Sequence, residues 1–166
     1  MKKSTIQLSK FFITNLNIKW VKGKASGNAI KLGFDFNLAF HEEHKNHFKL
    51  EFSVLAIPED GFSGIRLETQ IDGYFHFPEG IDFKEMHYLA ILNGSSILYG
   101  ILRGQLALIT GSFPGGKFML PAVVMEDVIP EVIKMKQQEV EKKEKKQKKI
   151  SAKPNKNKSK KKTPSQ

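Results

Sequence analysis

The chain contains no cysteine, so it can form neither a disulfide framework nor a thiolate nucleophile. This absence fits a reducing compartment, and Gln7, Ser9 and Lys10 interrupt the apolar core that an N-terminal secretion signal needs. The apolar run 89–109 has the length of a membrane span, but it contains Arg103, and an arginine near a bilayer centre costs about 2.5 kcal/mol or more. We therefore expect a cytoplasmic protein with no membrane insertion.

Catalytic patterns are also scarce. No Ser-His-Asp, Cys-His or paired-carboxylate arrangement has a suitable context in the sequence. The segment GSFPGGK (residues 111–117) has the spacing of a phosphate-binding loop, but it follows a predicted helix and precedes an extended run. The histidines of HEEHKNH (residues 41–47) lie in a predicted hairpin loop and not on one helix face. We expect no enzymatic activity, no cofactor and no resident metal.

Acidic residues are rare at the C-terminal end. From residue 134 onward there are 14 lysines and 3 glutamates, a net charge of +11, whereas the preceding part has 13 basic and 14 acidic residues, a net charge of −1. Residues 151–166 are mainly Lys, Asn, Ser and Pro, a composition typical of disorder. The length and this division predict one folded domain over residues 1–133 and a lysine-rich extension over 134–166.

Alternation of apolar and polar residues predicts β-strands, because successive side chains of a strand point to opposite faces. Four segments have this pattern: 6–20, 30–40, 48–54 and 65–77. It is clearest at 30–40 and weakest at 6–20, where Phe11 and Ile13 interrupt it. Because helices follow the strands, the chain predicts an α+β fold in which an antiparallel sheet of about four strands carries helices on one face.

Three helices are predicted after the strands. The main one covers 97–110, because the serines of 93–96 can cap a helix N-terminus and Gly111 suits a C-terminal position where φ is often positive. A short separate helix is expected at 85–92, and a later one from Asp127 onward.

The helix 97–110 has few polar positions, and a helix that is apolar nearly all round is buried or covered by another subunit. Gly100 and Gly104 stand one turn apart and leave the backbone bare, although glycine inside a helix costs roughly 0.5–1 kcal/mol relative to alanine. Packing on the chain's own sheet and contact with another subunit both explain this. Our candidates for an oligomer interface are Leu98, Gly100, Ile101 and Gly104.

Several pieces in this order resemble the SecB family of export chaperones, with a good match over 68–128 and a loose one elsewhere between 5 and 133. They are a glycine-aromatic strand end, a helix with spaced apolar residues around an arginine, a Phe-Pro loop, and a Leu-Pro-Ala-Val segment before an aspartate. In this chain the pieces are Gly73-Tyr74-Phe75, Ile97-Leu98 with Arg103, Leu106 and Thr110, Phe113-Pro114, and Leu120 to Val123 with Asp127.

The resemblance implies an ATP-independent holdase that binds unfolded preproteins for export and assembles as a dimer of dimers. It implies an apolar groove for extended clients, for which our candidates are Trp20, Phe75, Phe77, Phe118, Met119 and Leu120. It also implies a contact between the outer sheet surface and the translocase motor SecA, for which Glu68 and Asp72 are the candidates.

Two alternatives stay open at this point. The lysine-rich tail departs from the family pattern and suits non-specific contact with nucleic acid or ribosomes, which would make the protein a nucleic-acid or ribosome-associated module. Some SecB relatives serve a single client, such as a member of a toxin–antitoxin pair, and a client-dedicated chaperone is the other alternative.

Overall fold

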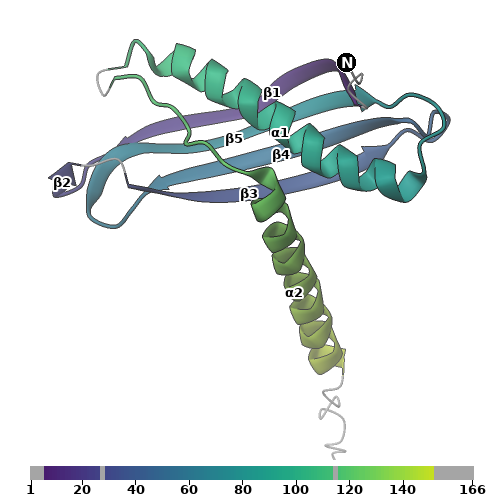
Figure 1. Ribbon diagram of the computed structural model, residues 1–166. Coiled ribbons are helices and arrows are strands. Elements are labelled where there is room, and N and C mark those ends of the chain that lie inside the picture. Colours follow the sequence, from purple (N-terminus) through teal and green to yellow (C-terminus); the bar gives the residue numbers. More distant parts are fainter. Residues whose placement is uncertain (1–5, 27–28, 114–115, 152–166) are drawn as a thin grey trace, which may run out of the picture. The chain divides into compact units, whose positions relative to one another are not determined.

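The computed structural model describes residues 6–26, 29–113 and 116–151. Four long strands form an antiparallel sheet in the spatial order β1-β5-β4-β3, and a long helix crosses one face of this sheet (Figure 1). The elements in chain order are β1 (Gln7–Val21), β2 (Ala25–Ser26), β3 (Ile30–Phe40), β4 (His47–Pro58), β5 (Phe62–His76), α1 (Phe83–Thr110) and α2 (Met125–Ser151). The predicted α+β fold with an antiparallel sheet is confirmed.

The alternating apolar and polar residues of the strands lie on opposite faces of the sheet. Phe36, Phe52 and Ile71 are in register across β3, β4 and β5, and all three are buried on the face that α1 covers. The predicted strand 30–40 matches β3. All nine charged side chains of the four long strands lie at positions facing the opposite side, which we call the outer face.

Strand β1 has a blurred sequence pattern because it is irregular. Its register against β5 shifts between Leu8 and Lys10 and again between Ile13 and Asn15. Each such bulge adds a residue to one strand and reverses the phase of the side chains that follow. Phe11 therefore shares a face with Leu8 and Ile13, although the sequence alone places it out of phase.

Helix α1 is one continuous helix, so the predicted break at 93–96 and the separate helix at 85–92 are wrong. Its N-cap is Asp82, whose carboxylate accepts hydrogen bonds from the backbone N–H groups of Lys84 and Glu85. Ser96 lies mid-helix, where its hydroxyl donates to the carbonyl oxygen of Leu92 at 2.8 Å. At the C-terminus Gly111 is right-handed, with φ of −56°, and not in the predicted positive-φ conformation.

Glycine sets how closely α1 approaches the sheet. A Cβ atom on Gly94 would lie 2.8 Å from Leu50 Cδ2. On the sheet, Gly73 is paired with Leu50, and a Cβ there would lie 2.7 Å from Leu98 Cδ2. Leu98 and Leu102 follow along the same side of α1 and are fully buried, and burying a leucine side chain contributes about 1.5–3 kcal/mol.

The chain that follows α1 is tied back to the helix by three side chains. Tyr99 Oη donates to the carbonyl oxygen of Pro121 at 2.8 Å, and Arg103 Nε donates to that of Leu120 at 2.8 Å. Thr110 Oγ1 accepts from the backbone N–H of Phe118 at 2.8 Å. We call residues 117–124 the strap; its Leu120 is fully buried.

By its internal contacts the chain divides into two compact units, residues 1–132 and 133–166. The first contains the sheet, α1, the strap and the start of α2, which buries Met125, Ile129 and Val132. The predicted disorder of 151–166 concerns residues that, from 152 on, lie outside the described part of the chain. Within the described ranges, no helix is both long and apolar enough to cross a membrane.

Candidate functional site

The sheet carries exposed apolar side chains at its β1 edge, on the side that α1 covers elsewhere. Helix α1 packs mainly on β4, β5 and β3. Phe11, Leu16 and Trp20 of β1 are therefore left 38%, 37% and 55% exposed, and we call these three residues the open apolar row. They lie opposite inward-facing residues of β5, so they point to the helix side of the sheet.

The row has two features that suit an extended polypeptide. Its three side chains lie along one extended strand and point to one face, with Ile13 and Ile18 between them on that face, so a second extended chain can run beside them. β1 is also an edge strand, and edge strands present unpaired backbone groups to a second chain.

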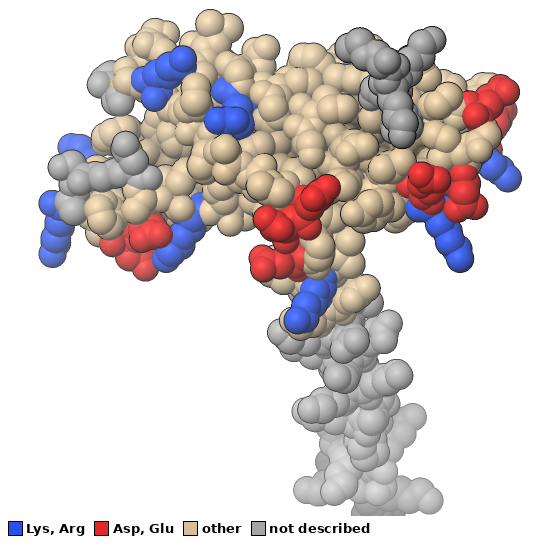
Figure 2. All heavy atoms as spheres, viewed as in Figure 1, with Lys and Arg blue, Asp and Glu red and all other residues tan. Residues whose placement is uncertain are grey.

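More exposed apolar surface lies on the helix and the strap. Leu108 of α1 is 75% exposed, Met119 of the strap is 51% exposed, and Val124 is also exposed. In Figure 2, which has the same view as Figure 1, most of the described surface is formed by uncharged residues, and the charged side chains form separate groups. Contiguous exposed apolar patches mark sites where proteins bind other chains, and these residues add to the apolar surface outside the open apolar row.

The six residues predicted for a polypeptide groove divide into two groups. Trp20 and Met119 are exposed and Phe118 is half-buried, so these three remain candidates. Phe75, Phe77 and Leu120 are at most 1% exposed. We correct their assignment to core positions, because side chains sealed inside one subunit offer no surface to a client.

The core role of the two buried phenylalanines has a clear geometric reason. The ring of Phe48 stacks on Phe75 at 5.1 Å and on Phe77 at 5.4 Å between centroids. Sequence reasoning missed Phe11, Leu16 and Leu108 as exposed residues. For the first two, the missing information was the pair of bulges that sets the phase of β1.

The predicted interface residues also separate. Gly100 and Gly104 are exposed on α1, and a Cβ atom at either position would meet nothing within 4 Å. Packing within the subunit therefore does not require glycine at these positions. Ile101 is half-buried, whereas Leu98 is fully buried in the subunit's own core and is corrected to a core residue.

On the outer face, Asp72 is a buried structural carboxylate. Lys49 Nζ lies 2.7 Å from Asp72 Oδ2 and 2.7 Å from Glu51 Oε1, and Gln70 Nε2 donates to Asp72 Oδ1 at 3.0 Å. Burial alone would raise the pKa of Asp72, but the hydrogen bonds from Gln70 and Lys49 and the charge of Lys49 outweigh it and lower the pKa. The hydrogen bonds to Asp72 and Glu51 raise the pKa of Lys49.

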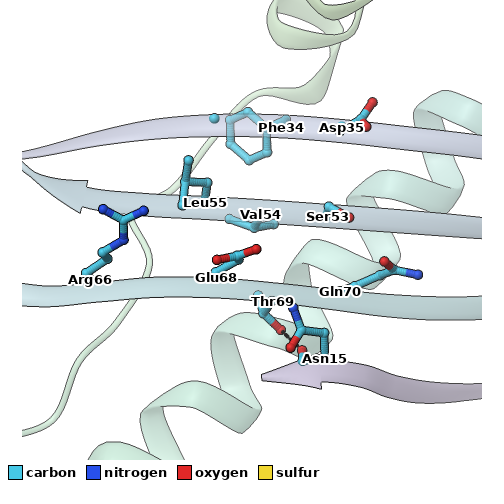
Figure 3. A pocket seen from close by; sticks show the side chains of 11 residues that line it. Asn15, Phe34, Asp35, Ser53, Val54, Leu55, Arg66, Glu68, Thr69 and Gln70 are labelled. Carbon is cyan, nitrogen blue, oxygen red and sulfur yellow. Dashed lines mark hydrogen bonds between the residues drawn. The ribbon is translucent and has the colours of Figure 1, made fainter. Parts of the chain in front are cut away.

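Glu68 is exposed and lines a shallow outer-face hollow of about 440 Å³ (Figure 3). The strand register places Asp35, Ser53 and Gln70 on the same face as Glu68. Figure 3 shows Arg66 beside Glu68 on β5. The four long strands present five cationic and four anionic side chains on this face: Lys10, Lys19, Lys31, Lys49 and Arg66 against Asp35, Glu51, Glu68 and Asp72. The face therefore has no excess of negative charge, and the SecA contact stays a prediction that depends on Glu68.

No family model and no curated protein matches the chain. Among solved structures it is similar to the Mycobacterium tuberculosis SecB-like chaperone Rv1957, determined in complex with a ChAD peptide from the Rv1956 HigA1 antitoxin. The TM-score is 0.58 at 15% identity, over 72% of this chain and 91% of that one. The two proteins share a fold. A protein of unknown function from Streptococcus agalactiae also matches, with a TM-score of 0.41 and 12% identity over 70% of this chain and 97% of that one.

Proposed function

We propose that this protein is an ATP-independent chaperone that holds unfolded polypeptides on the open apolar row. The exposure of Phe11, Leu16 and Trp20 along an edge strand carries the proposal. The SecB-like fold supports it, because the solved neighbour with that fold was determined with a peptide bound.

The chemistry of the row explains weak and broad selectivity. Burying one large apolar side chain contributes about 1.5–3 kcal/mol, so a single row grips a client weakly and without regard to its exact sequence. Strong retention then requires several rows on one assembly, because linked contacts raise the effective concentration of each. A dimer of dimers meets this need, and Gly100 and Gly104 are the positions at which a second subunit can approach α1 closely.

Suppression of aggregation tests the proposal. We expect the protein, without nucleotide and at stoichiometric amounts, to keep a chemically denatured client from aggregating. The double substitution Leu16→Ser and Trp20→Ser should reduce this suppression severalfold. Tyr88→Ser, which removes an exposed aromatic residue near the N-terminus of α1, is the matched control and should leave the suppression unchanged. Equal suppression by the row variant and the wild type would reject the row as the client site.

The client range has two candidate answers. A SecB-type export chaperone accepts many preproteins and passes them to SecA, whereas a client-dedicated chaperone protects one partner. The antitoxin peptide on Rv1957 favours the dedicated type as the second candidate. A panel of unrelated denatured clients, together with the proteins encoded beside this gene, separates the two. Suppressed aggregation of most clients supports the general type. Suppressed aggregation of only a protein encoded beside this gene supports the dedicated type.

We propose that the lysine-rich tail is separate from this activity. Ten lysines and no acidic residue occur from 145 to the C-terminus, so replacing these ten lysines with glutamine in the full chain removes the basic charge. Loss of RNA binding with intact suppression of aggregation supports a chaperone domain with an accessory tail. Loss of both would favour the nucleic-acid or ribosome-associated alternative. We propose a cytoplasmic, non-enzymatic protein in either case.

A further inference from the structure

All five histidines of the chain belong to one end of the sheet and the adjoining start of α1. Four of them form a continuous line of ring contacts, which we call the histidine row. The ring centroids are 5.1 Å apart for His41 and His44, 5.4 Å for His44 and His47, and 5.6 Å for His47 and His76. His87, on α1, is outside the row.

The row is attached to the backbone that closes the β3–β4 hairpin. The backbone N–H of His47 donates to the carbonyl oxygen of His44 at 2.8 Å, and the N–H of His41 donates to that of His47 at 2.9 Å. The ring of His41 also takes part, because its Nδ1 accepts from the backbone N–H groups of Glu43 and His44, each at 3.2 Å. An Nδ1 that accepts two hydrogen bonds carries no proton, so this arrangement requires neutral His41.

A second set of bonds joins the row to the connector between β5 and α1. The side-chain amide of Asn46 donates to the carbonyl oxygen of Phe77 at 3.0 Å, and the N–H of Phe77 donates to that of Asn46 at 2.9 Å. With its NH₂ group turned to Phe77, Asn46 offers its Oδ1 to His47 Nδ1 at 3.1 Å. We therefore assign the His47 proton to Nδ1, which leaves Nε2 to take up a proton on acidification.

Protonation of neighbouring rings in this row would place like charges 5.1 to 5.6 Å apart. His47 is exposed, but partial desolvation by its neighbours lowers its pKa, and the charges of His44, His76 and His41 lower the pKa further. A group whose folded-state pKa is lowered opposes protonation, so the stability it supports is present above its ordinary pKa of 6.5 and is lost as the pH falls below that value.

The surrounding charges are mixed. On the outer face, Lys49 follows His47 on β4, and β1 contributes Lys10, whose Nζ lies 4.7 Å from the Tyr74 ring centroid. The hairpin loop itself contains Glu42, Glu43 and Lys45, and Ser9 Oγ lies 3.1 Å from His76 Nδ1. Among the described residues, no three His, Cys, Asp or Glu side chains are placed to share a metal ion.

We propose that the histidine row is a proton-sensitive clasp. In its neutral form it closes the β3–β4 hairpin and, through Asn46, holds the connector that leads to α1. Protonation of His41 at Nδ1 removes the acceptor for the backbone N–H groups of Glu43 and His44. Protonation of His47 at Nε2 keeps its hydrogen bond to Asn46 but adds a positive charge beside the rings of His44 and His76. The resulting repulsion separates the rings and frees the Asn46–Phe77 contact. This conformational device does not depend on the proposed chaperone function.

Amide hydrogen exchange on the full-length protein without client tests the clasp, with rates corrected for the intrinsic effect of pH. We expect the protection factor of the Phe77 amide to fall about tenfold between pH 7.5 and 5.5, while that of Phe52 in the middle of β4 changes little. His47→Gln and His76→Gln should each weaken this pH dependence. His87→Gln is the matched control and should keep it.

Two results would overturn the proposal. One is a Phe77 protection factor that does not change with pH in the wild type. The other is an equal fall of the Phe77 protection factor in the wild type and in the folded His47→Gln and His76→Gln variants. If His47→Gln does not fold, His76→Gln decides, and NMR titration adds an independent measurement, because the midpoint of His47 should rise when His76 is replaced.

Discussion

Gly94 of α1 lies directly against Leu50 of β4, so closely that a Cβ atom on Gly94 would stand 2.8 Å from Leu50 Cδ2. This contact fixes the height of α1 above the sheet. It also explains a small residue in the middle of a 28-residue helix, where glycine is otherwise unfavourable.

The substitution Gly94→Ala should therefore destabilise the protein. Overpacking a tight core costs about 1–3 kcal/mol, and the gain in helix propensity of roughly 0.5–1 kcal/mol offsets only part of this cost. Urea unfolding should show a lower unfolding free energy for Gly94→Ala. Ser96→Ala, two residues along on the exposed side, should change it by less than about 0.5 kcal/mol. Increased stability of Gly94→Ala would contradict the close approach.

The sequence predicted the regular strands well and the helix poorly, for one physical reason. Alternation is a local property, so residues 30–40 could be assigned to a strand without knowing their neighbours. Gly94 and Ser95 have the composition of a break, yet they lie where the helix meets the sheet, and Ser95 is fully buried there. No local pattern distinguishes a small residue that breaks a helix from one that lets it pack closely.

The site was only partly predictable for similar reasons. Phe75 follows the same alternation as Ile71, which already places it on the core face. Leu120 gives no such indication, because its burial depends on the distant Arg103, which holds its carbonyl oxygen to α1. Trp20 could be identified as a candidate, but its exposure depends on how far α1 reaches across the sheet.

Asp72 should link stability to acid pH. Asp72→Asn removes the ion pair with Lys49 and should lower the unfolding free energy at pH 7 by roughly 1–3 kcal/mol. The pKa of Asp72 is lowered in the folded protein, so its stabilisation is complete above the ordinary value of 3.8 and is lost as the pH falls below it. Urea unfolding between pH 7 and pH 2.5 should show the wild type and variant converge. A constant difference would contradict the assignment.

Tyr99 should link stability to alkaline pH. Burial raises the pKa of Tyr99 to about 12, against the smaller opposing effect of Arg103. The neutral phenol that donates to Pro121 is stabilising below the ordinary pKa of 10, and this contribution is lost as the pH rises toward 12. Tyr99→Phe should cost about 0.5–1.5 kcal/mol at neutral pH and should weaken the alkaline loss of stability. An unchanged alkaline profile would contradict a buried Tyr99 hydroxyl.

Substitution of the two glycines on the exposed side of α1 tests whether subunits associate through this helix. In an isolated subunit, Gly100→Leu with Gly104→Leu should be tolerated, since neither Cβ atom meets a neighbour within 4 Å and leucine favours a helix more than glycine does. In an oligomer that packs on this side, the added side chains should prevent association. Light scattering should then show a smaller particle with unchanged helix content by circular dichroism, whereas Tyr88→Leu should keep the wild-type mass.

The central claim is that β1 presents apolar side chains to unfolded clients, and Trp20 reports on it directly because it is the chain's single tryptophan. The measurement is the fluorescence of Trp20 in the full-length protein during titration with an unfolded polypeptide that contains no tryptophan. Since Trp20 is 55% exposed, client binding should shift its emission to shorter wavelength in a saturable way, and Leu16→Ser should weaken the apparent affinity. Emission that stays unchanged while the client is demonstrably bound would contradict the claim.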